Sequence, residues 1–516
     1  MDLIIKLGFL VIFFGVMIGV GFYCRRHATD VNGFVLGGRS VGPWLTAFAY
    51  GTSYFSAVVF VGYAGQFGWK YGISATWIGV ANALLGSLLA WAVLGRRTRV
   101  MTQHLGSATM PQFFEKRMGS RSLKIAASAV IFIFLIPYTA SLYNGLSRLF
   151  AMAFDVPYWL CVVIMAVLTG IYVIAGGYMA TAINDFIQGI IMLIGIVAVI
   201  AAVLKGEGGF LGALDGLARV SDPAVSETPG VFASFFGPDP LNLLGVMILT
   251  SLGTWGLPQM VQKFYAIKSE KDINKGMIIS TLFAAVVAGG CYFLGGFGRL
   301  FPVDVASEGF DAIVPTMLSK LPTVLIAVVL VLVLSASMST LSSLVLASSS
   351  TLTLDFLKDL RKKKMSDKTQ LLVMRVLIVV FIAVSVVIAI VQYNSGATFI
   401  AQLMGISWGA LAGAFLAPFL YCLYWKRTTK AACWVNFVFS TVVMLAVVLC
   451  KEIFPPILQS PINAGAFCML AGMIIVPVVS LLTKGPEKQL ADEIFACYDR
   501  KVVVTARDAI GSEEKE

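Results

Sequence analysis

Apolar stretches of about 20 residues recur along most of this 516-residue chain, and each is long enough to cross roughly 30 Å of hydrocarbon as a helix. Since no water reaches the centre of a bilayer, backbone polar groups must be bonded within each segment, and a helical bundle follows. Hydrophobic residues make up 58% of the chain and charged residues 13%, which is far outside the range of soluble domains. The sequence therefore predicts an all-α integral membrane protein that lies within the lipid bilayer.

The basic clusters set the expected topology. Clusters at 25–26, 96–99, 361–364 and 426–427 all fall on one side when thirteen spans are threaded with the N-terminus outside and the C-terminus in the cytoplasm. The thirteen predicted spans are 3–24, 42–67, 73–94, 123–154, 158–174, 182–204, 241–266, 277–301, 321–357, 371–391, 398–425, 431–450 and 463–482. This arrangement predicts a multi-pass protein of the cell's inner (plasma) membrane.

Composition argues against several other classes of protein. The net charge of +11 comes from short clusters between spans, so it indicates topology rather than nucleic-acid binding. Eight cysteines lie scattered without paired spacing, which predicts neither a disulfide framework nor a cysteine metal site. Only two histidines are present, and no nucleophile, base and orienting group can be assembled, so an enzyme is not expected.

Two spans are interrupted near their middle by glycine and polar residues, at 51–56 and at 253–259. Without the first and last two spans, ten remain, and each half of five begins with an interrupted span. Because five is odd, the second half enters the membrane from the opposite face. Matching broken helices in inverted halves indicate a midplane site in secondary transporters. The alternative is that glycine and proline merely kink two helices.

This pattern divides the chain into six parts. They are an N-terminal extra helix (1–26), a first inverted repeat of five helices (42–204), an extracellular loop (205–240), a second inverted repeat of five helices (241–427), two C-terminal helices (431–482) and a cytoplasmic tail (483–516).

A cluster of hydroxyls lies inside the apolar run that begins near residue 321. On a helix, Ser339, Ser342 and Ser343 share one face, and Thr340 lies about 100° around the axis. Hydroxyl and carbonyl oxygens are the ligands that a small hard cation accepts when it loses water. The competing interpretation is that these hydroxyls bond the preceding turn or allow close helix packing.

Three motifs together resemble the sodium:solute symporter family, and the proline and pantothenate symporter branch is the most similar. They are Gly37-Gly38-Arg39-Ser40-Val41-Gly42, then Gly176-Gly177 with Asn184-Asp185 and Gln188, and Met338-Ser339-Thr340-Leu341-Ser342. The resemblance covers nearly the whole chain. It implies the 5+5 inverted-repeat fold of the leucine transporter and Na⁺ as the coupling ion, with one or two ions in each cycle.

The resemblance also implies two sodium sites. The common site would use main-chain carbonyls of Thr52, Phe55 and Ala336 and the hydroxyls of Ser339 and Thr340. The second would use Asp185, Ser339, Ser342 and Ser343. A carboxylate such as Asp185 within a span is expensive and therefore a functional candidate, although it could also cap a helix at the membrane edge or carry a proton.

The sequence defines the solute only by class. The candidate pocket residues are Tyr54, Phe55, Tyr138, Thr254, Trp255, Gln259 and Gln402. Family proline transporters have an aspartate where this chain has Tyr54, and aromatics where it has Thr250 and Thr254, which argues against proline itself. An anionic group would rely on helix N-termini and hydroxyls, as small carboxylates can.

The expected function is sodium-coupled symport, by alternating access, of a small organic solute such as an amino acid or a pantothenate-like acid. The expected working unit is a monomer whose partners are the solute, sodium ions and the bilayer. The alternatives are a proton-coupled transporter of the same fold, a transporter-like sensor or receptor, and a channel. The sensor would need an output domain, and the two broken helices argue against a continuous pore.

Overall fold

The computed structural model describes residues 2–154, 156–357, 365–395 and 400–499, and these are almost entirely helical. Within these residues, ten helices are long and apolar enough to cross a membrane, and a bent pair makes up to eleven. The expectation of an all-helical membrane protein is confirmed. Counting these helices does not give thirteen spans. Two of the ten helical stretches, Val58–His104 with 47 residues and Tyr158–Gly206 with 49 residues, are far longer than one crossing needs.

The longer helices are α1 (Asp2–Tyr23), α3 (Pro43–Tyr54), α8 (Arg121–Phe154), α9 (Tyr158–Gly206), α11 (Pro240–Gly256), α13 (Glu270–Gly295), α16 (Thr323–Thr351), α18 (Asp367–Ser395), α19 (Ile400–Tyr424), α20 (Lys430–Leu449) and α21 (Pro461–Leu482). The shorter ones are α2 (Val31–Leu36), α4 (Ala64–Tyr71), α5 (Thr76–Ala81), α6 (Arg96–His104), α7 (Met110–Met118), α10 (Gly209–Ala218), α12 (Pro258–Ala266), α14 (Val305–Glu308), α15 (Ile313–Ser319) and α22 (Lys488–Phe495). Helix α10 lies within the segment expected to be a loop.

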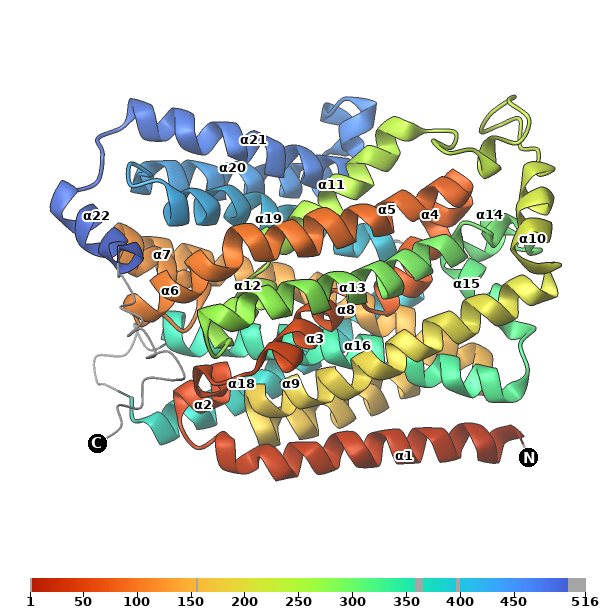
Figure 1. Cartoon of the computed structure of the whole chain (residues 1–516), viewed down its shortest axis with the longest axis horizontal. Helices are drawn as coiled ribbons and strands as arrows, with labels where there is room; N and C mark the ends of the chain where they lie inside the picture. The colour runs from red at the N-terminus through yellow and green to blue at the C-terminus, as the bar shows by residue number, and fades with distance from the viewer. Residues whose placement is uncertain (1, 155, 358–364, 396–399, 500–516) are drawn as a thin grey trace, which may run out of the picture.

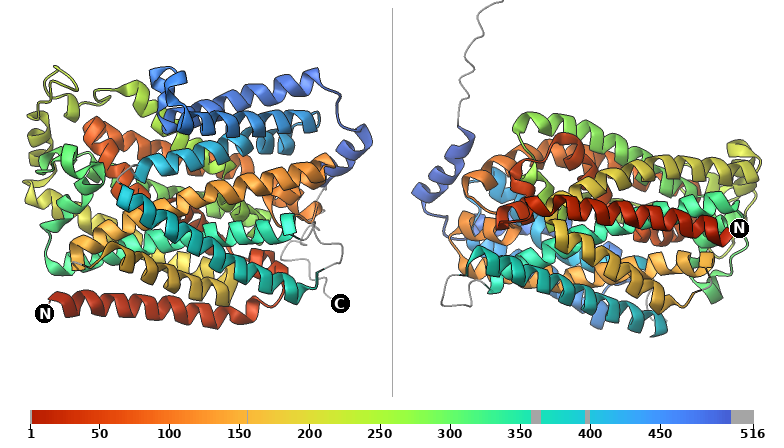
Figure 2. Two further views of the ribbon diagram at one scale, coloured as in Figure 1. Left: turned by 180° about the vertical axis from the view of Figure 1, so that it is seen from behind. Right: turned by 90° about the horizontal axis from the view of Figure 1, so that it is seen from below.

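The long helices lie side by side in one bundle, with α1 along one edge and α20 and α21 along the opposite edge (Figures 1 and 2). Helices α16 and α19 are the most buried spans, whereas α1 is the most exposed. The short helices α2, α6, α7 and α22 gather at one end of the bundle, and α10, α14 and α15 gather at the other (Figure 1). The hydroxyl-rich α16 therefore lies inside protein, where its polar groups can find partners.

Both predicted helix breaks are present, and each has a local cause. Helix α3 ends at Tyr54, and Phe55 takes an extended conformation before the chain resumes as a wide π-helical turn. Helix α11 ends at Gly256, and Leu257 is extended because a residue before proline disfavours the helical region. Pro258 then begins α12 at an angle of 46° to α11. Proline is favoured at this first helical position, where its missing N–H costs nothing.

A reversal at Gly177 folds the 49-residue α9 into two arms. Gly177 has φ 54° and ψ −147°, a conformation open only to glycine. Tyr172 lies directly against Gly21 of α1, and the Asn184 amide donates to the carbonyl of Met17, one turn away on the same helix. Twelve residues of straight helix would span about 18 Å, so the chain must turn back between these two contacts.

We expect Gly177→Ala to lower the melting temperature of the protein by several degrees. The new Cβ would lie 2.8 Å from the Phe34 carbonyl oxygen, and the backbone conformation itself would cost about 1–3 kcal/mol. The matched control is Gly15→Ala in α1, where no atom lies within 4 Å of the added carbon. Equal melting temperatures for Gly177→Ala and wild type would contradict the reversal.

Candidate functional site

The broken end of α3 meets the middle of α16 in a cluster of oxygen atoms. The Thr340 Oγ1 lies 3.1 Å from the carbonyl oxygens of Thr52, Phe55 and Ala336. The Ser339 Oγ lies 3.1 Å from the carbonyls of Thr52 and Ala336. All five residues predicted for the common sodium site are therefore brought together, and all are buried. Their atoms are the hard oxygen donors that an alkali cation accepts, so the site fits sodium.

The break explains why these carbonyls are available. The last carbonyls of a helix have no intrahelical partner, and the extended Phe55 ends α3 just beyond Thr52. On the far side of the break, the N–H groups of Ala57 and Val58 are bonded by the hydroxyls of Ser337 and Ser56. The break thus exposes carbonyl oxygens toward α16, while serine hydroxyls satisfy the N–H groups that follow.

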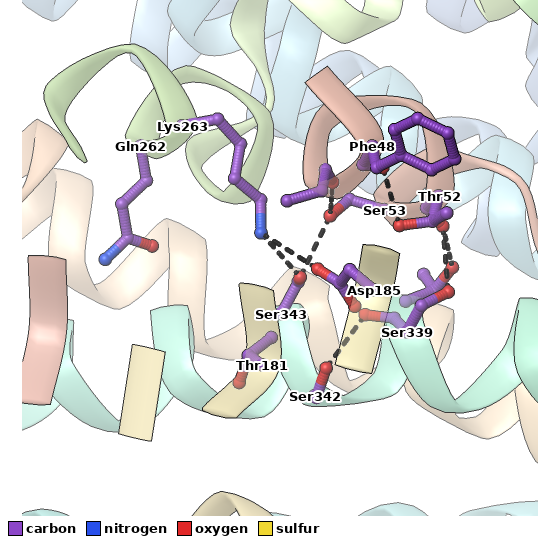
Figure 3. A network of polar contacts seen from close by, with 12 residues as sticks. Phe48, Thr52, Ser53, Thr181, Asp185, Gln262, Lys263, Ser339, Ser342 and Ser343 are labelled. Atoms are coloured by element: carbon purple, nitrogen blue, oxygen red, sulfur yellow. Dashed lines mark hydrogen bonds and ion pairs between the residues drawn. The ribbon is translucent and has the colours of Figure 1, made fainter. Parts of the chain in front are cut away.

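A second cluster contains a buried ion pair, which Figure 3 shows. Asp185 of α9 is fully buried, and its carboxylate oxygens make no hydrogen bond with any described residue. The Nζ of Lys263, on α12, lies 3.7 Å from the Asp185 Oδ2 and donates to the Ser343 Oγ at 3.0 Å. The Ser343 hydroxyl is also 2.9 Å from the Ser53 Oγ of α3. This cluster therefore joins α3, α9, α12 and α16.

The residues predicted for the second sodium site divide between these clusters. Ser339 belongs to the first cluster, whereas Ser342 donates to the Ser339 carbonyl at 2.9 Å. Ser343 and Asp185 both face Lys263 (Figure 3). Sequence reasoning missed Lys263. The available signal was a cation inside a predicted span, which is the rule that singled out Asp185.

The predicted solute residues have different surroundings. Phe55 and Tyr138 are buried, and Tyr138 lies edge-on to Trp408 with ring centroids 5.9 Å apart. Gln259, in the first turn of α12, is buried, and its amide nitrogen and oxygen bond no described residue. Gln402 lines a cavity of about 900 Å³. An unbonded amide such as that of Gln259 is costly to bury, so it marks a place where a polar ligand would be stabilising.

Two other predicted solute residues bond a neighbouring helix. The Thr254 hydroxyl donates to the Gly86 carbonyl, and the Trp255 indole donates to the Leu85 carbonyl, each at 2.9 Å. Thr250 bonds its own helix at Val246. The side chain of Tyr54 lies outside the described residues. In contrast, the side chains of Phe55, Tyr138, Gln259 and Gln402 make no hydrogen bond to the backbone of a neighbouring helix in the described structure.

The elements that line the 900 Å³ cavity include α4 and α14, which lie at the end of the bundle opposite α6, α7 and α22 (Figure 1), and the cavity carries charges of both signs. Arg299 donates to Asp222 at 2.9 Å and stacks over the ring of Phe232. Lys70 and Asp239 also line the cavity. The Arg299 charge is thus already paired with Asp222 within the cavity wall.

The basic end is closed by arginines that bind backbone carbonyls. Arg39 donates to the carbonyls of Tyr265 and Ser107, and Arg99 donates to that of Ile267. Arg39 follows two left-handed glycines and is itself left-handed, with φ 55°, which is uncommon for a side-chain-bearing residue. Burial, together with nearby Arg99, lowers the pKa of Arg39 to about 10, so the guanidinium stays charged at neutral pH. The segment before the first broken helix is thereby tied to the end of the second.

Comparison with known proteins identifies the family. The model of the "Sodium:solute symporter family" matches residues 34–438. The chain belongs to this family. It is therefore a transporter and not an enzyme, Na⁺ is its coupling ion, and its activity is Na⁺-coupled symport of a solute.

Individual relatives agree with this assignment. The chain is 31% identical over 494 residues to the sodium/proline symporter of Staphylococcus aureus (strain NCTC 8325 / PS 47), covering 92% of each chain. A Na⁺-coupled sialic acid symporter in a substrate-bound, outward-open state has a similar fold, with TM-score 0.75 and 17% identity, over 94% of this chain and 98% of the other. A manganese transporter of Eremococcus coleocola is more distant, with TM-score 0.50 and 12% identity over 91% and 96%.

We expect Arg39→Ala to lower the melting temperature more than loss of an exposed arginine does. It would leave buried carbonyls without donors, at about 1–3 kcal/mol for each unsatisfied group. The matched control is Arg427→Ala, because this exposed arginine donates to a single carbonyl, that of Leu481, at 3.2 Å. Equal losses of melting temperature in the two variants would show that Arg39 does not close this end.

Proposed function

We propose that this symporter carries a small carboxylate solute, of the amino acid or pantothenate type, into the cell by alternating access. The observation that supports it most is the Thr340 hydroxyl, which lies 3.1 Å from carbonyls on both α16 and the broken end of α3. A sodium ion bound among these oxygens would hold the two helices together. The first helix break would then already have the conformation that binds the solute, so the affinity for the solute would rise with sodium concentration.

The second break supports a carboxylate as the solute's charged group. Gln259 brings a buried amide without a described partner to the first turn of α12. The N-terminus of a helix attracts an anion through its N–H groups and dipole. In this turn Pro258 has no N–H, and the Met260 N–H already bonds the Leu257 carbonyl at 3.1 Å, so the side-chain amide of Gln259 is a donor that remains without a described partner. At the first break, the hydroxyls of Ser337 and Ser56 bond the N–H groups of Ala57 and Val58. We therefore propose that the carboxylate binds beside Gln259, with Phe55 and Tyr138 forming the apolar walls.

We infer thirteen spans from the ten long helices and the bent pair. Two of the long helices change direction at glycines with positive φ, Gly72 and Gly177, and each would supply two crossings. This count supports two five-helix inverted repeats, at 42–204 and 241–427. The basic clusters support an outer N-terminus and a cytoplasmic C-terminus in the plasma membrane. The large cavity would then face outside, and one chain would work alone because both oxygen clusters lie within it.

We propose that Asp185, Ser339, Ser342 and Ser343 hold a second sodium ion once Lys263 withdraws. The buried carboxylate of Asp185 requires a cation, and Lys263 supplies one at 3.7 Å in this conformation. Two unit charges about 4 Å apart interact by about 4 kcal/mol at an effective dielectric constant of 20. The ammonium group and a sodium ion would therefore compete for the same carboxylate.

The first test is thermal stability of the purified protein with amino acids including proline, pantothenate, short carboxylates, sugars and sialic acid, in sodium or potassium at equal ionic strength. We expect a carboxylate solute to raise the melting temperature only in sodium, because binding stabilises the folded state by mass action. An inward sodium gradient should drive accumulation of the same solute in proteoliposomes. Stabilisation by sugars alone would exclude a carboxylate.

Thr340→Val is the matched variant for this test, since valine keeps the shape and removes the hydroxyl. We expect at least a tenfold loss of apparent sodium affinity, or about 1.4 kcal/mol, with an equal loss of sodium-linked solute affinity. Thr281→Val is the control, because that hydroxyl bonds only the Met277 carbonyl of its own helix. Unchanged sodium dependence in Thr340→Val would exclude the common site.

Asp185→Asn and Lys263→Met should change sodium binding in opposite directions. Removing the ammonium leaves Asp185 to attract sodium, so Lys263→Met should raise sodium affinity and cooperativity. Removing the carboxylate should reduce binding to a single non-cooperative ion, measured as a sodium Hill coefficient near one. The double variant is electrically balanced, and it should retain the single-ion behaviour with near wild-type stability. Equal sodium curves for all three variants would refute the second site.

A further inference from the structure

An apolar groove of about 630 Å³ lies between the end of α1, the first arm of α9 and α18. Its walls include Phe22, Val163, Ile171, Val379 and Val386. Apart from two arginines, every side chain that lines it is apolar. Since these helices form the outer layer of the bundle, the groove faces the surrounding lipid (Figure 2).

The two arginines, Arg25 and Arg375, make the groove unusual. Arg25 lies in the short turn that follows α1, and its exposed side chain makes no hydrogen bond or ion pair with a described residue. Arg375 lies about 12 Å along α18 from Asp367. Its Nε is buried without a hydrogen-bond partner among the described residues, and its guanidinium lies 5.7 Å from the Phe34 ring centroid. A buried guanidinium N–H without an acceptor is costly, which indicates a missing anionic partner.

A second groove on the same helix gives an internal comparison. It has a volume of about 340 Å³ and lies along the middle of α1, against α9 and α16. Its lining includes Phe9, Ile12, Ile187 and Val331, and it contains no charged side chain. Lipid chains can cover such a surface without preference for a headgroup. Of these two grooves, the one with Arg25 and Arg375 combines apolar walls with charged side chains.

We propose that this groove is a binding site for an anionic phospholipid. The phosphate lies between Arg25 and Arg375, which gives the Arg375 Nε its acceptor, and an acyl chain lies along the apolar walls. The choice of a lipid rests on charge complementarity and on position, because the groove includes the C-terminal end of α1, which lies at the end of the bundle with the basic residues 25–26, 96–99 and 426–427. Basic pockets between membrane helices on this side bind anionic headgroups. The site is independent of the solute proposed above.

The test measures the melting temperature of the detergent-purified protein titrated with phosphatidylglycerol or with phosphatidylcholine of the same acyl chains. We expect half-maximal stabilisation at a concentration at least fivefold lower for phosphatidylglycerol. Arg25→Gln and Arg375→Gln should each raise that concentration about fivefold, since one arginine near an anionic headgroup contributes about 1 kcal/mol. Arg375→Lys should retain the preference, which separates loss of charge from misfolding.

Arg26→Gln is the control, because this neighbouring arginine donates to the Tyr23 hydroxyl and does not line the groove. It should bind phosphatidylglycerol like the wild type. Equal stabilisation of the wild type by both lipids would overturn the proposal, as would an unchanged preference in the double variant of Arg25 and Arg375. Inorganic phosphate is the third arm. If phosphate alone stabilised the wild type and not the double variant, the ligand would be a free anion rather than a lipid.

Discussion

The structure depends on how the carbonyl oxygens at the end of α3 are satisfied inside the bundle. An unbonded carbonyl in hydrocarbon costs several kcal/mol, so a helix cannot simply stop at mid-membrane. Here the Thr340 hydroxyl lies within bonding distance of Thr52 and Phe55, and the buried α16 supplies it. A single hydroxyl donates only one hydrogen bond, however, so it cannot satisfy three carbonyls at once. The remaining lone pairs are what make the cluster suitable for sodium.

The same reasoning applies to the buried charges, for which the free-energy cost of losing a partner is larger. Removing one partner of a buried ion pair costs far more than removing both, because the remaining charge has no partner. Asp185 and Lys263 belong to α9 and α12, and Ser53 and Ser343 connect them to α3 and α16. Any movement that separates α12 from α9 must therefore bring another cation to Asp185 or leave it uncompensated. This requirement links ion occupancy to the relative position of the helices.

Hydropathy predicted the bundle and both breaks because these depend on residue type along the chain. The extended Leu257 follows directly from Pro258. Helix periodicity placed Ser339 and Thr340 on adjacent faces, but the expectation that their hydroxyls meet the carbonyls of the first break came from the family resemblance. Thr254 was predicted for the solute pocket, but its hydroxyl bonds Gly86, since the direction of a side chain depends on the helix beside it. Lys263 was overlooked because a lysine near the end of a predicted span is usually interpreted as a topology signal. Its burial becomes apparent only from the position of α12 inside the bundle.

The two ends of the bundle differ in their side-chain contacts, and this difference bears on what a bound sodium ion would do. At one end, arginine side chains bind the backbone where the two broken helices converge, through Arg39 to Tyr265 and Arg99 to Ile267. At the other, Gln402 and the charged residues Lys70, Asp222, Asp239 and Arg299 line a 900 Å³ cavity. Separating the helices at the first end would leave the carbonyls of Tyr265 and Ile267 without these arginine donors, at a cost for each buried group that no new partner bonds. The oxygen cluster joins α3 to α16 between these two ends, so a sodium ion bound at the proposed common site would hold the first broken helix against α16.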